Sequence, residues 1–110
     1  MKNMQHENLC MLARLKSDRA LGALAREFSV RAGLIEQMQA LGVSVRDARS
    51  YAANDISFGS NVANVEVFCA SRMKQLKIQL NKCDAKISEL KAHAANEFGR
   101  VIVLEKLLKT

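Results

Sequence analysis

The sequence predicts an all-α protein, a long antiparallel two-helix coiled-coil hairpin. Three observations favour this fold: an apolar repeat of three and four residues in the second half, the absence of proline, and one dense cluster of turn-forming residues near the middle. An apolar repeat of this period is typical of a helix that packs along another helix. We therefore expect residues 1–110 to form a single hairpin, with helices over 5–54 and 62–109 and a turn over 55–61.

The second helix has the clearest pattern. Its repeat predicts a seam, meaning the line of side chains that faces the other helix. Cys69 and Cys83 both lie on this seam, about 21 Å apart along the helix axis, which is too far for a disulfide. We expect them to be buried free thiols. The predicted seam consists of Cys69, Met73, Leu76, Leu80, Cys83, Ile87, Leu90, Ala94, Glu97, Val101, Leu104 and Leu108.

The first helix is less regular. A break in its pattern is expected near Ser17, because Leu12 and Leu15 are out of phase with the apolar residues that follow. Gly42 leaves two alternatives open: the helix ends there and a short helix starts near Ser44, or the helix bends and continues. The predicted seam of this helix consists of Leu21, Leu24, Phe28, Arg31, Ile35 and Met38.

A reversal between Asn54 and Asn61 gives two helices of nearly equal length and fixes which residues face each other. Phe28 should lie near Ile87, and Ile35 near Leu80. Glu97, the one acidic residue on the second seam, should face Arg19. We expect these two residues to form an ion pair that fixes the register of the hairpin.

Two regions carry more apolar side chains than a seam requires, and exposed apolar clusters mark contact sites. Two other interpretations are open: a third helical segment folds back over the turn, or two chains form a four-helix bundle. At the C-terminal end the candidates for partner binding are Phe98, Arg100, Ile102, Val103, Lys106 and Leu107. Near the turn they are Ile56, Phe58, Val65 and Phe68.

No motif in the sequence indicates catalysis. No nucleophile lies beside a plausible base, and no glycine-rich phosphate loop is present, so we expect neither an enzyme, a cofactor nor a small-molecule substrate. Glu89, His93 and Glu97 form one helical ridge, but no second cluster completes a metal site, and ordinary intrahelical pairing is expected. The net charge is +6, but the basic residues are not accompanied by the stacking aromatic residues of a nucleic-acid-binding protein. This pattern favours a solvated basic face.

The sequence also bears on where the protein is found. Only 5% of its residues are aromatic, a composition that suits a thin coiled coil. No apolar run reaches the roughly 18–20 residues of a membrane span, and the first residues show no secretory signal. These features predict a cytoplasmic protein.

The run from Ala95 to Leu107, which includes Glu97-Phe98-Gly99-Arg100 and Leu104-Glu105-Lys106-Leu107, is similar to the endings of short FliJ-family export stalk proteins. These are proline-free helical hairpins of flagellar and type III export systems, and the resemblance covers the whole chain in architecture. The first half departs from the family pattern, because it carries Gly22, Gly33 and Gly42.

The resemblance implies a non-enzymatic central stalk that is cytoplasmic and peripheral to the membrane export apparatus. Its paired ends would enter a hexameric export ATPase, its turn would reach a membrane export gate component, and it would escort export chaperones. By position, the C-terminal candidates would contact the ATPase ring and the turn candidates the gate. Two alternatives remain: a homodimeric helical-bundle adaptor, and a basic helix pair that binds nucleic acid.

Overall fold

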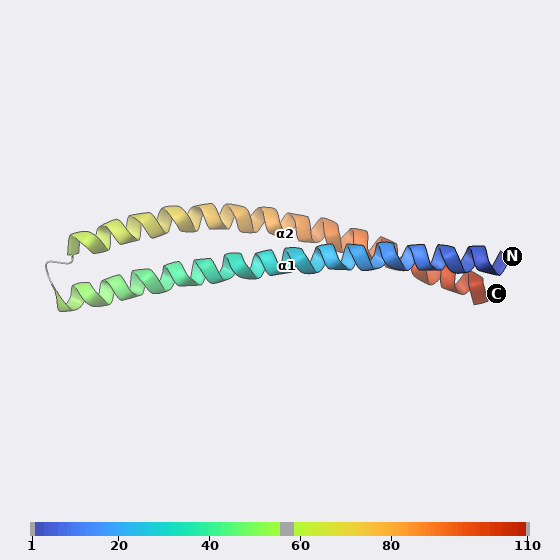
Figure 1. Cartoon of the computed structure of the whole chain (residues 1–110). Helices are drawn as coiled ribbons and strands as arrows, with labels where there is room; N and C mark the ends of the chain where they lie inside the picture. Colours follow the sequence, from blue (N-terminus) through green and yellow to red (C-terminus); the bar gives the residue numbers. More distant parts are fainter. Residues whose placement is uncertain (1, 56–58, 110) are drawn as a thin grey trace. The chain divides into compact units, whose positions relative to one another are not determined.

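The protein consists of two long helices. A computed structural model describes residues 2–55 and 59–109. Its elements are α1 (Lys2–Asn54) and α2 (Gly59–Lys109) (Figure 1), and the described residues include no strand. The all-α helical hairpin expected from the sequence is therefore confirmed.

Contacts between the helices divide the chain into two compact units. Unit 1 comprises Met1–Ser29 and Asp84–Thr110, and unit 2 comprises Val30–Cys83. Each unit contains a segment of α1 and a segment of α2, so each is a two-helix structure with its own buried residues.

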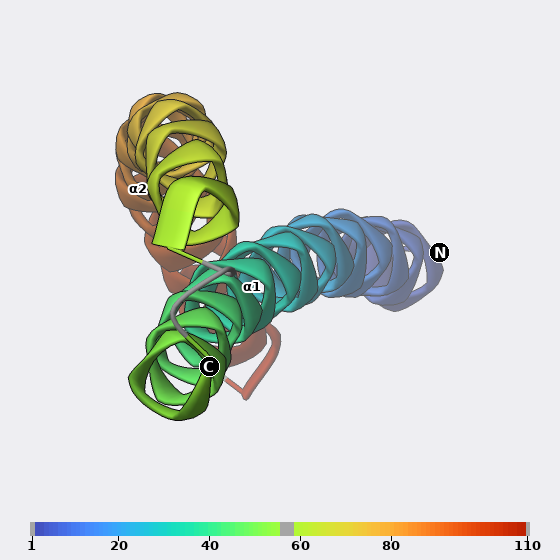
Figure 2. The same cartoon turned by 90° about the vertical axis from the view of Figure 1, so that its left-hand side faces the viewer.

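Helix α1 does not end at Gly42. The helix continues through this glycine to Asn54 (Figure 2), and no glycine with a positive φ interrupts it among the described residues. The Ser44 hydroxyl donates a hydrogen bond of 3.0 Å to the carbonyl oxygen of Ala40, four residues earlier, instead of capping a new helix. Of the two alternatives left by the sequence, the continuous helix is correct.

The expected reversal agrees with the helix ends. The Asp55 N–H donates to the carbonyl oxygen of Tyr51 at 3.0 Å, and the side chain of Asn54 donates to the carbonyl of Ser50 at 3.3 Å. These bonds satisfy carbonyl groups in the last turn of α1, which otherwise lack partners. Helix α2 begins at Gly59, slightly before the expected start.

Unit 2 is an antiparallel pair with larger buried residues. Arg49 pairs with Glu66 at 2.8 Å, and Arg72 donates to Gln37 at 3.2 Å, so residue numbers rise along α1 as they fall along α2. Leu76 is completely buried, with none of its surface accessible to solvent. The buried residues of this unit are Leu34, Ala48, Cys69, Leu76 and Cys83.

The segment of α1 in unit 1 buries small side chains. Its buried residues are Cys10, Ala13, Ser17 and Ala20, spaced by three, four and three positions. The expected break near Ser17 is wrong, because this spacing passes through Ser17 without interruption. Because small residues allow two helix backbones to approach closely, the helices can pack together at these four positions without a large apolar side chain.

The large apolar residues of the predicted first seam behave differently from one another. Leu21 and Phe28 are exposed, whereas Leu24 and Met38 are half-buried. The Phe28 ring lies beneath Lys91, whose amine is 5.5 Å from the ring centroid, within the range of a cation–π contact. Phe28 therefore packs at the flank of the helix pair and not on its seam.

The segment of α2 in unit 1 follows the predicted seam. Its buried residues are Ile87, Ala94, Glu97 and Val101, while Leu90 and Leu104 are half-buried. Two ion pairs join the helices at the flanks: Arg14 with Glu105, and Glu27 with Lys86 at 3.4 Å. These pairs show that the helices of unit 1 are antiparallel.

Candidate interaction surface on unit 1

Unit 1 exposes large apolar side chains from both of its helices. Phe98 is 55% exposed and Leu12 is 50% exposed. On α1 these side chains are outside the seam, because its positions in this unit are taken by small residues. On α2 the placement of Leu108 on the seam is wrong, because this residue near the end of the helix is 38% exposed. On α1 the exposed set is Met4, Leu9, Met11, Leu12, Leu15, Leu21 and Phe28, and on α2 it is Phe98, Ile102, Val103, Leu107 and Leu108.

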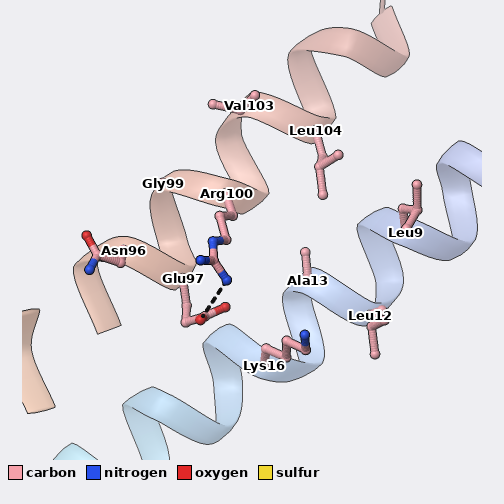
Figure 3. Close-up of a pocket in the computed structure, with 10 residues that line it drawn as sticks. All are labelled: Leu9, Leu12, Ala13, Lys16, Asn96, Glu97, Gly99, Arg100, Val103 and Leu104. Atoms are coloured by element: carbon pink, nitrogen blue, oxygen red, sulfur yellow. Dashed lines mark hydrogen bonds and ion pairs between the residues drawn. The ribbon is translucent and has the colours of Figure 1, made fainter. Parts of the chain in front are cut away.

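One side of unit 1 is hollowed into a groove of about 630 Å³ between α1 and α2. Figure 3 shows that Leu104 and Ala13 point toward each other across it, and that the Glu97 side chain extends toward α1. The lining is mainly apolar, with two cationic side chains. Helix α1 contributes Leu9, Leu12, Ala13 and Lys16, and α2 contributes Asn96, Glu97, Gly99, Arg100, Val103 and Leu104.

Glu97 is a buried carboxylate in this groove, with only 6% of the residue exposed. Its Oε1 accepts a hydrogen bond of 3.3 Å from Nη1 of Arg100 on the same helix (Figure 3). Its Oε2 is buried and has no hydrogen-bond partner. A buried polar atom without a partner costs about 1–3 kcal/mol.

The expected ion pair between Glu97 and Arg19 is wrong. Arg19 is exposed, and the carboxylate pairs with Arg100 instead. The physical reason is local: residues three positions apart are neighbours on a helix surface, so Arg100 reaches Glu97 without spanning the helix pair.

The candidate residues at the C-terminal end lie on two sides of unit 1. Arg100 and Val103 line the groove, whereas Phe98 and Ile102 do not. Phe98 and Ile102 are four residues apart, so they are neighbours on one face of α2. Lys106 and Leu107 are also exposed on this helix. The structure thus separates an apolar face around Phe98 and Ile102 from the groove.

The candidates near the turn belong to unit 2. Val65 is half-buried, and Phe68 is 67% exposed beside the exposed Val67. Ile56 and Phe58 lie outside the described residues. The described candidates are on the first turns of α2, and Phe68 is the one that offers a large accessible apolar surface.

Sequence reasoning missed Leu9, Leu12, Lys16 and Gly99 as groove residues. The signal was present for Leu12, because its apolar side chain is out of phase with the seam and must therefore face a flank. Gly99 lines the groove as well, although a glycine within a long helix lowers its stability by about 1 kcal/mol relative to alanine.

The remaining chemistry of the chain is sparse. Cys10, Cys69 and Cys83 are buried free thiols, as expected for the two on α2. Among residues 2–55 and 59–109, no cluster of three or more His, Cys, Asp or Glu side chains could hold a metal ion, and neither helix contains a segment long and apolar enough to cross a bilayer. The hydrogen bond to Glu105 raises the pKa of Arg14 above its already high ordinary value, so this cation stays charged.

Comparison of the chain with protein-family models, with curated proteins and with solved structures finds no match.

Proposed function

We propose that the chain is a non-enzymatic central stalk of a flagellar or type III protein export ATPase complex, which couples the ATPase to the export apparatus and escorts export chaperones. The observation that carries the proposal is the exposure of large apolar side chains at the C-terminal end of α2, beside basic residues. Phe98 and Ile102 are exposed there, together with Lys106 and Lys109.

The surface chemistry supports insertion of this end into a protein bore. Apolar side chains flanked by cations suit a partner with apolar walls and acidic residues, because complementary charge orients the encounter and apolar burial supplies affinity. Unit 1 joins the first 29 residues to the end of α2, so both terminal segments would enter the ring of a hexameric ATPase as one helix pair.

The second contact of a stalk would use the described residues that follow the turn. Phe68 and Val67 are exposed on α2, and in this proposal they contact a membrane export gate component. Val65, which is half-buried, would support them.

The test uses the purified chain and the export ATPase encoded in the same genome. We expect Phe98→Ser with Ile102→Ser to abolish co-purification with the ATPase and to leave helicity, measured by circular dichroism, nearly unchanged. Both side chains are exposed, so their loss should cost the isolated chain little stability. The matched control is Val30→Ser with Val43→Ser, which alters two exposed valines of unit 2 and should leave binding intact.

Two results would contradict the proposal. If the Phe98 and Ile102 variant binds the ATPase as the unchanged chain does, this face does not make the contact. If the variant loses its helicity, the two side chains stabilise the chain's own fold and are not available to a partner.

A further inference from the structure

The two units differ in what they bury. Among the residues that the structure describes, two polar residues are buried, Ser17 and Glu97, and both belong to unit 1. The fully buried positions of α1 in this unit carry small side chains. In unit 2 the same helix buries Leu34, and Ile35 and Met38 are half-buried. Because stabilisation by burial grows with the apolar area removed from water, α1 contributes less to helix pairing in unit 1 than in unit 2.

Glu97 adds a cost that exists only while the helices of unit 1 are paired. Its side chain extends toward α1 (Figure 3), and its Oε2 is buried without a hydrogen-bond partner. Arg100 contacts Oε1 at 3.3 Å, but 67% of the Arg100 side chain is exposed, and water screens an ion pair with so exposed a cation. When the helices separate, water reaches Oε2 and the cost of burying this oxygen is removed.

The ion pairs between the helices do not offset this difference. In the two pairs of unit 1 and in the Arg49–Glu66 pair of unit 2, the basic side chain is 61–64% exposed. Exposed ion pairs contribute little to stability, so they favour neither unit. The buried carboxylate and the small seam residues of α1 therefore decide which unit is held together more weakly, and both belong to unit 1.

We infer that unit 1 is a conformational device: its two helices separate in a local opening while the helices of unit 2 remain paired. Glu97 sets how often unit 1 opens, because burial of its carboxylate opposes the closed form. Opening makes the α2 seam of this unit accessible, including Ile87 and Val101, which are 5% and 7% exposed in the closed form. Different regions of one protein open with different free energies, and here the difference follows from what each unit buries.

This inference goes beyond the proposed function and does not depend on it. Phe98 and Ile102, which carry the proposed function, are exposed in the closed form, so their contact with a partner requires no opening. The opening is measured on the purified chain alone. A failure of this inference and a failure of ATPase binding are therefore separate results.

The first experiment is hydrogen exchange of individual backbone amides in the full chain, followed by NMR. The reporters are the amides of Ala94 in unit 1 and Leu34 in unit 2. Both residues are buried and lie well inside their helices, so fraying of a helix end does not expose them. We expect Ala94 to exchange at least about tenfold faster than Leu34, relative to the intrinsic rate of each amide. Equal protection of the two amides would show that the chain opens as one unit and would overturn the inference.

The second experiment changes each unit in turn. We expect Glu97→Leu to slow exchange at Ala94 about tenfold, because leucine buries no carboxylate. Leu76→Val should speed exchange at Leu34 about fivefold, because one buried methylene group is lost. The same substitution should leave exchange at Ala94 unchanged, because unit 2 is paired in both the closed and the open form of unit 1. Circular dichroism reports on the helicity of each variant, and Leu34→Val, followed at the amide of Cys83, replaces Leu76→Val if that variant does not fold.

The matched control is Glu89→Leu, because Glu89 lies on the same helix and in the same unit but is exposed. This variant should leave exchange at Ala94 unchanged. Two further outcomes would overturn the inference. Leu76→Val could speed exchange at Ala94 as much as at Leu34, which would show that the two units open together. Glu97→Leu could slow exchange at Ala94 no more than Glu89→Leu does, which would show that the buried carboxylate does not govern the opening.

Discussion

At the scale of single residues, burial on α2 depends on whether a side chain is on the seam. Ile87 is 5% exposed and Ile78 is 51% exposed, although both are isoleucines within the same helix. The seam repeat of the sequence contains Ile87 and excludes Ile78, and this distinction is confirmed. The pair is therefore a matched test of what burial contributes to stability.

We expect Ile87→Ala to destabilise the chain by about 2–5 kcal/mol, since it removes buried methyl groups and leaves a cavity. Ile78→Ala should change the free energy of unfolding by no more than about 0.5 kcal/mol. Urea unfolding followed by circular dichroism measures both values. Equal effects of the two substitutions would contradict the assignment of the α2 seam.

Glu97 shows what sequence spacing alone cannot provide. Its position on the seam was predicted, and its burial confirms that position. Its partner was not predicted correctly, because the choice between Arg100 and Arg19 depends on side-chain reach. A neighbour three residues away on the same helix is always within reach, whereas a partner on the other helix must also match its angular position.

At the scale of the helices, α2 was more predictable than α1. The seam of α2 consists mainly of apolar residues that stand out by size and hydropathy, so its period is visible in the sequence. In unit 1 the seam of α1 consists of Cys10, Ala13, Ser17 and Ala20. These small residues contribute little to a hydropathy pattern. The prediction therefore placed the larger Leu21 and Phe28 on the seam, whereas both lie on a flank of the helix pair.

The glycines of α1 give a prediction about helix stability. Gly33 lies within α1, and a Cβ atom there would meet nothing within 4 Å. We expect Gly33→Ala to stabilise the chain by about 1 kcal/mol, because alanine loses less backbone entropy on folding. The measurement is the melting temperature, which should rise. A fall would show that Gly33 is in contact with another group or is needed for a bend in α1.

At the scale of the whole molecule, each unit buries few large apolar side chains and exposes many. Among the described residues, Leu76 is the one large side chain that is fully buried. The sequence predicted correctly that apolar side chains would be exposed at the C-terminal end of α2. It did not predict the groove, because a groove forms from two segments distant in sequence, Leu9–Lys16 and Asn96–Leu104. Their alignment depends on the α1 seam, of which Leu24 was assigned correctly and Leu21 and Phe28 were not.

Small residues form the α1 seam of unit 1, and the large apolar side chains of this helix segment are therefore exposed. The most direct measurement is urea unfolding of two neighbouring variants, Ala20→Leu and Leu21→Ala. Ala20 is 4% exposed and Leu21 is 49% exposed. We predict that Ala20→Leu destabilises the chain by about 1–3 kcal/mol, because overpacking forces the helices apart, and that Leu21→Ala changes stability by no more than about 0.5 kcal/mol. A large loss for Leu21→Ala together with a neutral Ala20→Leu would contradict the claim and place Leu21 on the seam.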